Sequence, residues 1–256
     1  MKGFTAVFKR ELYAFFASPI FYVVGTIFLA LSGYFFYTSV AYYSLISFQA
    51  AQNPYMGGQV NLNEMVVKPL FDDMSIILLL IVPLLTMRLL AEEKKNGTIE
   101  LLLTYPVREL AVVLGKYLAT LLVIIILLAL TAINIFMISR FGVVEWGPVL
   151  TGYGGLILLA ASFVSLGLFA SALTQNQIIA AVLGFGALLM FWIIGWAGSV
   201  SGPAVGEVVN YLSLLEHQDP FTKGILDTRD IMYYLTFLVF FIFLTLRYLD
   251  SQKIRG

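Results

Sequence analysis

The chain has 256 residues, of which 60% are hydrophobic and 12% are charged, and its mean hydropathy is +0.92. A soluble domain carries about twice this charged fraction, and a disordered chain is far less hydrophobic, so the composition excludes both a water-soluble globular enzyme and a disordered protein. The 15 basic and 15 acidic residues balance, which gives no indication of nucleic-acid binding. With no cysteine and one histidine, disulfides, cysteine-ligated metals and multi-histidine metal sites are excluded as well. The composition therefore predicts a polytopic membrane protein.

The N-terminal stretch MKGFTAVFKRELYAFF differs from the apolar runs that follow it. Phe4, Phe8, Leu12 and Phe15 recur at helical spacing, with charged residues between them. This pattern is typical of an amphipathic helix that lies in the plane of the membrane interface. A cleavable signal peptide is the alternative, but the apolar region that follows is far too long for the core of a signal peptide.

Six apolar runs follow, and charged or turn residues separate them. A helix needs roughly 20 apolar residues to cross about 30 Å of hydrocarbon. The second run is short and contains Pro83, which is expected to kink it. We predict an all-α membrane protein in which residues 1–256 form a single transmembrane domain. Its six spans are predicted at residues 19–42, 74–91, 117–139, 148–173, 178–200 and 231–249.

The distribution of basic residues predicts the orientation of these spans. With the N-terminus inside, 11 of the 15 Lys and Arg side chains fall on the inner side, whereas nine of the 15 Asp and Glu side chains fall on the outer side. Cytoplasmic loops carry the excess of Lys and Arg in membrane proteins. Both termini are therefore expected in the cytoplasm, in agreement with an even number of spans.

The outer segment between the fifth and sixth spans, residues 201–230, is long and partly apolar. Its apolar positions between residues 208 and 215 predict one or two short helices that rest on the outer leaflet or dip into it. The same segment contains His217, with Glu216 and Asp219 nearby. A metal site would need more ligands than these, so we expect His217 to be a surface residue.

The inner loop between the second and third spans is the most informative segment, and it reads RLLAEEKKNGTIELLLTYPVRELAVVLGK from residue 88 to 116. Residues 92–95 predict a solvated turn of helix. Gly97 predicts a helix stop, because glycine adopts the left-handed cap conformation freely. Thr98 can then cap a second short helix that Pro106 ends. Such an element can be pushed by a partner, although an ordinary polar inner loop is the alternative on composition alone.

This loop resembles the signature of ABC-2 type permeases, in which an acidic and basic cluster is followed by G-T-x-E-L-L, then P-V, then G-K. The N-terminal FKRELYAFFASPIFYVV and the segment LSLLEHQDPFTKGILDTRDIMYYL also resemble this family, in particular its gliding-motility-associated branch. The resemblance covers the whole chain. The first outer loop, however, is short for that branch.

The resemblance implies the transmembrane subunit of an ABC exporter, which pairs with a second permease copy or a related permease and sits on separate ATPase subunits. An auxiliary membrane protein and a bacterial-type inner membrane are implied as well. By position, residues 98–103 would be the coupling helix that enters a groove on the ATPase, and the N-terminal helix would make a second contact. The residues that the resemblance assigns to the ATPase-coupling interface are Lys9, Arg10, Glu11, Glu92, Glu93, Gly97, Thr98, Glu100, Leu101, Leu102 and Pro106.

The chain is not expected to be an enzyme or to hold a cofactor. A P-loop requires G-x-x-x-x-G-K-[ST], but Leu110 stands where the first Gly is needed and Tyr117 follows Lys116 where Ser or Thr is needed. ATP and Mg²⁺ would therefore be bound by the partner ATPase, which would supply the energy.

Three other classes of membrane protein are alternatives. A channel or secondary carrier usually needs an ionisable side chain in mid-membrane, and none lies there in the predicted spans. A membrane enzyme needs clustered acidic or histidine residues at one face. The inner-face glutamates are instead interleaved with Lys and Arg and lack a histidine. A non-transporting anchor subunit stays open, because its sequence would look the same.

Overall fold

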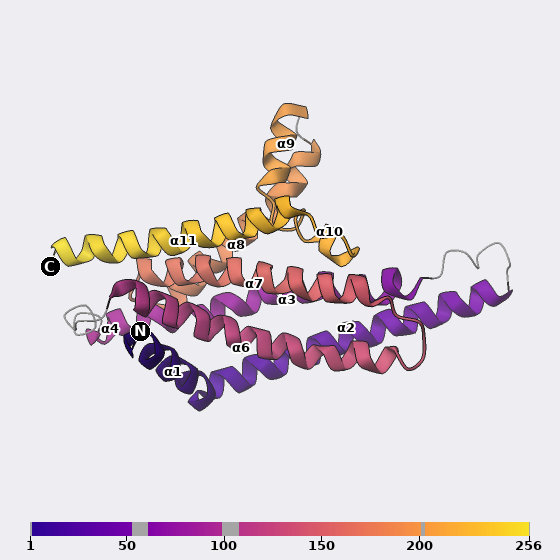
Figure 1. The fold of residues 1–256 in the computed structure, drawn as a ribbon, viewed down its shortest axis with the longest axis horizontal. Coiled ribbons are helices and arrows are strands. Elements are labelled where there is room, and N and C mark those ends of the chain that lie inside the picture. The colour runs from indigo at the N-terminus through magenta and orange to yellow at the C-terminus, as the bar shows by residue number, and fades with distance from the viewer. Residues whose placement is uncertain (1, 53–60, 99–107, 201–202, 256) are drawn as a thin grey trace.

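A computed structural model describes residues 2–52, 61–98, 108–200 and 203–255, and over these residues the chain is helical with no strand (Figure 1). The long helices α2, α3, α6, α7 and α11 lie side by side roughly along one axis, whereas α9 stands across it. Both termini lie at the same end of the bundle, which we call the termini end. The elements are α1 (Lys2–Ala17), α2 (Pro19–Gln52), the π-helix η2 (Asn63–Val67), α3 (Lys68–Thr86), α4 (Arg88–Lys95), α6 (Glu109–Ile138), α7 (Trp146–Leu173), α8 (Gln177–Val200), α9 (Pro203–Tyr211), α10 (Asp219–Thr222) and α11 (Thr228–Arg255).

The predicted all-α architecture with six membrane-spanning helices is confirmed. In the described ranges, six helical stretches are long and apolar enough to cross a bilayer. They are Pro19–Gln52, Asn63–Lys95, Glu109–Ile138, Trp146–Leu173, Gln177–Trp196 and Thr228–Gln252. A separate helix, α1, precedes the first of them, and the short helices α9 and α10 lie between the last two.

Several helices differ from their predicted bounds. α6 begins at Glu109, before the predicted start of the third span at residue 117, and α11 extends beyond the predicted 231–249 at both ends. α2 continues to Gln52, well beyond the predicted end at residue 42, because the uncharged segment after Tyr42 keeps helical hydrogen bonding where the apolar run stops. The second span is not short, since η2, α3 and α4 follow one another from Asn63 to Lys95. Charges at residues 72 and 73 interrupt the hydropathy of this stretch but not its helix.

The core of the bundle is α7, which packs against α3, α4, α6, α8, α10 and α11. Of the most apolar part of each helix, 78% is buried in α7 and 72% in α3, but only 28% in α2, α8 and α11. α3 and α7 approach closely where Gly167 faces Thr86, and a Cβ on Gly167 would overlap the Thr86 hydroxyl. The outer helices therefore present apolar faces to the surrounding membrane, and the two central helices form a closely packed pair.

The junction between α3 and α4 is held by a side chain of α7. Pro83 lies inside α3, and the helical path is interrupted at Met87, one residue before α4 begins. The first N–H groups of a helix have no partner within it. Here the Ser171 hydroxyl accepts hydrogen bonds from the amides of Leu90 (3.0 Å) and Ala91 (3.1 Å), and it donates to the Met87 carbonyl (2.9 Å). Ser171 thus caps α4 from a neighbouring helix.

Candidate functional site

The termini end holds a cluster of ion pairs that joins three helices, and we call it the charge junction. It consists of Arg10 and Glu11 on α1, Glu93 on α4 and Lys116 on α6. The Lys116 ammonium lies 2.7 Å from Glu11 Oε1 and 3.0 Å from Glu93 Oε1, and the Arg10 guanidinium lies 3.3 Å from the same Glu93 oxygen. Lys116 is 1% exposed, so its charge is compensated by these carboxylates rather than by water.

The crossing of α1 over α6 depends on Gly115, the residue before Lys116. A Cβ at Gly115 would lie 2.9 Å from Val7 Cγ1 and 3.3 Å from the Phe8 backbone nitrogen. Because glycine has no Cβ, the two backbones approach closely enough for Glu11 to reach Lys116. Gly115 therefore permits the close approach of α1 and α6, and Lys116 provides the ion pair that holds them together.

The predicted solvated turn at residues 92–95 is wrong for two of its four residues. Glu92 and Lys95 are exposed, but Glu93 and Lys94 are buried. Glu93 points into the charge junction, whereas the Lys94 ammonium donates to the Ala172 carbonyl at the end of α7 and lies 4.6 Å from the ring centroid of Tyr248 on α11. α4 is thus tied on one side to α1 and α6 and on the other to α7 and α11.

The end of α4 has the glycine stop that the sequence predicts. Gly97 has φ +67°, the left-handed conformation, and its amide donates to the Lys94 carbonyl (3.2 Å). The Thr98 hydroxyl donates to the Glu93 carbonyl (3.2 Å), so it stabilises the end of α4. The remaining predicted coupling residues, Glu100, Leu101, Leu102 and Pro106, lie outside the described residues.

A polar recess of ≈ 370 Å³ opens beside the charge junction. Besides the four residues of the junction, it is lined by Arg88, Glu92, Asn96 and Thr98, among others. The Arg88 guanidinium lies 4.4 Å from the ring centroid of Phe15, which holds α1 against the start of α4. Lys9, the remaining predicted residue of α1, is exposed. The termini end therefore offers a charged, hollowed surface next to the end of α4.

The family model for ABC-2 family transporter proteins matches residues 5–249, nearly the whole chain. The chain belongs to the ABC-2 transporter family. It is therefore the membrane permease subunit of an ABC transporter, and the family implies an ABC ATPase as its partner. A comparison with the curated proteins gave no match.

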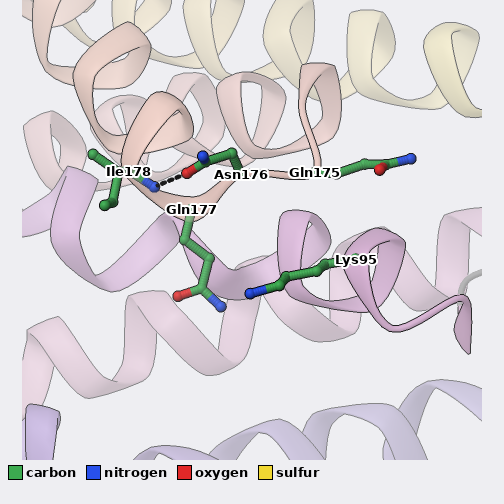
Figure 2. A pocket seen from close by; sticks show the side chains of 5 residues that line it. All are labelled: Lys95, Gln175, Asn176, Gln177 and Ile178. Carbon is green, nitrogen blue, oxygen red and sulfur yellow. Dashed lines mark hydrogen bonds between the residues drawn. The ribbon is translucent and has the colours of Figure 1, made fainter.

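A second recess of this ABC-2 permease, ≈ 450 Å³ in volume, lies between the end of α4 and the turn that joins α7 to α8. Figure 2 shows Lys95 of α4 directed towards Gln177, while Gln175 points away. The Asn176 side chain caps α8 by accepting a hydrogen bond from the amide of Ile178 (2.9 Å). This recess and the charge junction thus flank α4 on two sides.

The permease also has a buried polar cluster between its fifth and sixth spans, where the sequence predicts a surface histidine. That prediction is wrong, because His217 is 5% exposed. Its Nδ1 lies 2.6 Å from Asp230 Oδ1, its Nε2 lies 2.9 Å from the Tyr211 carbonyl oxygen, and its ring stacks on Tyr233 at a centroid distance of 3.9 Å. The contacts come from Tyr211 at the end of α9 and from Asp230 and Tyr233 at the start of α11.

Three charges link α3 to α10 on the side of the bundle away from the termini. The Lys68 ammonium lies 2.6 Å from Asp219 Oδ1, and Lys223 pairs with the other carboxylate oxygen. Partial burial opposes ionisation of Asp219, but hydrogen bonds from Lys223 and Lys68 outweigh it and hold the pKa of this carboxyl below its usual value. In the part of the chain that the structure describes, no three His, Asp or Glu side chains come together as metal ligands.

Sequence reasoning missed the residues that connect the predicted interface to the rest of the bundle. Lys116 was placed in a loop before the third span, but it lies inside α6. Lys94 was predicted to be solvated, and no cap for α4 from a neighbouring helix was predicted. The sequence has no local signal for the burial of Lys116, because a lysine at the start of a span ordinarily extends to the head groups.

Proposed function

We propose that the chain is the transmembrane subunit of an ABC exporter, in which residues 98–103 form the coupling helix that docks on the partner ATPase. The charge junction is the observation that carries this proposal. It joins α4, which directly precedes the coupling segment, to α1 and α6 through Lys116, Glu11 and Glu93. A push on α4 by the ATPase would reach two further helices without passing through a flexible loop.

The second route of transmission runs through α7. Ser171 and the Ala172 carbonyl bind α4 from the opposite side, and α7 is the most buried helix of the bundle. Displacement of α4 would therefore be passed to α3 and α7 together, which would tilt the second span against the third and open an outward path between them. In this proposal the termini end is cytoplasmic, as the excess of basic residues there favours, and the membrane is a bacterial-type inner membrane.

We further infer that the permease pairs with other membrane proteins. The bare apolar faces of α2, α8 and α11 support pairing with a second copy or a related permease, since each would bury surface that one chain leaves open. The segments that resemble the gliding-motility-associated branch support an auxiliary membrane protein as a further partner. ATP and Mg²⁺ are bound by the ATPase, and this chain is a non-catalytic subunit.

The test is a pull-down of C-terminally tagged protein from native membranes in mild detergent, followed by mass spectrometry. We expect a stoichiometric partner with a P-loop, and we expect Glu100→Arg to remove it. Glu207→Arg on α9 is the matched control, because it makes the same charge change at an exposed position outside α1 and α4. An eluate with intact permease and no P-loop protein would overturn the proposal and favour an anchor subunit or a carrier.

A further inference from the structure

An apolar hollow of ≈ 330 Å³ lies between α1 and α6. Phe4 and Phe8 form one wall, with their rings stacked at a centroid distance of 6.1 Å. The other wall is a stripe of α6 formed by Leu118, Leu121, Leu122 and Ile125. These four residues follow the spacing of one helix face, so the hollow is a continuous apolar surface rather than a chance gap.

The hollow is a consequence of how the two helices cross. α1 and α6 are in closest contact at Gly115, where Val7 and Phe8 rest on the glycine, and the Lys116–Glu11 ion pair secures this crossing. The lining residues of α6 begin one turn beyond the crossing. Because crossing helices diverge on either side of their contact point, a wedge-shaped opening remains between Phe4, Phe8 and the α6 stripe.

The surroundings determine which kind of molecule can enter this hollow. α6 is a membrane-spanning helix with the highest mean hydropathy of the six stretches, 3.0, and only 39% of its most apolar part is buried. Water would find no hydrogen-bond partners on this surface, so it would not fill the hollow stably. A hydrocarbon chain matches both the lining and the medium.

The exposed charge on α1 indicates the head group. Glu11 is buried and paired with Lys116, whereas Lys9, which directly follows Phe8, is exposed, and the Arg10 side chain is 61% exposed. Among the described side chains of α1, the charges that reach the surface are therefore basic. Basic side chains beside a membrane surface attract the phosphate of anionic lipids.

We propose that α1 and α6 form a binding site for an anionic phospholipid in the leaflet at the termini end, with one acyl chain in the hollow and the phosphate on Lys9. The site shares Lys9 with the ATPase-coupling interface that the resemblance assigns, but its hollow between α1 and α6 contains none of the other interface residues, and lipid binding can be measured without the ATPase. Its occupant would brace α1 against α6 on the side that the charge junction does not hold.

The experiment uses the purified full-length protein in detergent, mixed with equal amounts of phosphatidylglycerol and phosphatidylcholine of the same chain length, and counts bound lipids by native mass spectrometry. The wild type should retain phosphatidylglycerol in preference to phosphatidylcholine. Leu122→Trp, which fills the hollow, should lower phosphatidylglycerol retention about tenfold. Leu130→Trp is the matched control, since Leu130 is an exposed position of α6 outside the hollow, and it should retain the lipid.

Lys9→Gln tests the head group and, as an exposed substitution, does not depend on core packing. It should lower the preference for phosphatidylglycerol about fivefold while phosphatidylcholine binding is unchanged. Equal retention by Leu122→Trp and wild type would overturn the proposal. So would a loss of dimer mass in Leu122→Trp alone, because that result would identify a second copy of the chain as the occupant.

Discussion

Lys116 and Glu11 form a buried ion pair of 2.7 Å between α6 and α1, and Glu93 of α4 shares the same ammonium. Removing one partner of a buried pair leaves an uncompensated charge, which costs about 3–5 kcal/mol. We therefore expect Lys116→Met to lower the melting temperature strongly, because Glu11 loses its counter-charge and Glu93 keeps only Arg10. Glu11→Gln should cost less, since its amide oxygen still accepts a hydrogen bond from Lys116.

Thermal unfolding of the purified protein in detergent checks both variants. The double variant Lys116→Met with Glu11→Gln should recover part of the loss, because it removes the carboxylate that has lost its counter-charge. If the two single changes are additive instead, the side chains do not interact as the distances indicate.

Ser171 is expected to be the main polar support of α4. Ser171→Ala leaves the amides of Leu90 and Ala91 without their partner, and each buried unsatisfied group costs about 1–3 kcal/mol. Amide hydrogen exchange should therefore accelerate at the start of α4. Ser165→Ala is the matched control on α7, because the Ser165 hydroxyl donates to the Ser162 carbonyl within the same helix. Equal exchange rates in the two variants would contradict the capping role.

Gly97 is required because of its backbone conformation, and not because a larger side chain would lack space. Its φ is +67°, and a Cβ built on it meets nothing within 4 Å. A β-branched residue in this conformation costs about 1–2 kcal/mol, whereas asparagine tolerates it. Gly97→Val should therefore weaken recovery of the ATPase partner in the pull-down, and Gly97→Asn should restore it. Equal recovery with both variants would show that the turn does not set the direction of the coupling segment.

The sequence predicted the architecture well where a local pattern carries the information. Apolar runs separated by charges identify six spans, and the Gly97 stop follows from glycine's conformational range. The length of α2 was underestimated, because hydropathy marks where apolar residues end and not where helical hydrogen bonding ends.

The burial of single charged residues could not be predicted in the same way. Glu93 and Lys94 are neighbours of exposed Glu92 and Lys95, and they differ only in the helices that cover them. Those partners, α1 with α6 on one side and α7 with α11 on the other, are distant in the sequence. His217 was misplaced for the same reason, since its partner Asp230 belongs to α11.

His217 is expected to stabilise the segment between α9 and α11. His217→Phe keeps a ring stacked on Tyr233 but leaves the Tyr211 carbonyl and the buried Asp230 carboxylate unpaired, which costs about 3 kcal/mol or more. Asp230→Asn should cost less, because its amide oxygen accepts a hydrogen bond from the ring. Melting temperature and hydrogen exchange at residues 211–217 measure both effects. If His217 were a surface residue, His217→Phe would change neither the melting temperature nor the exchange rates.

The ion pairs of Asp219 predict a loss of stability in acid. The folded pKa of Asp219 is lowered, so its contribution is complete above the unfolded pKa of about 3.9 and is lost as the pH falls through the folded value. The pKa of Lys223 is raised by its hydrogen bond to Asp219, so its contribution is lost only as the pH rises through that raised value. The pairs are therefore intact across the neutral range.

Asp219→Asn tests this dependence. Because Asp219 is partly exposed, the expected destabilisation at neutral pH is below about 1 kcal/mol, and the difference in melting temperature from wild type should vanish as the pH falls below the lowered pKa of Asp219. Glu207→Gln, at an exposed carboxylate of α9, should follow the wild type throughout. If the Asp219→Asn difference persists in acid, the carboxylate acts through packing rather than through its charge, and α10 is held to α3 by other contacts.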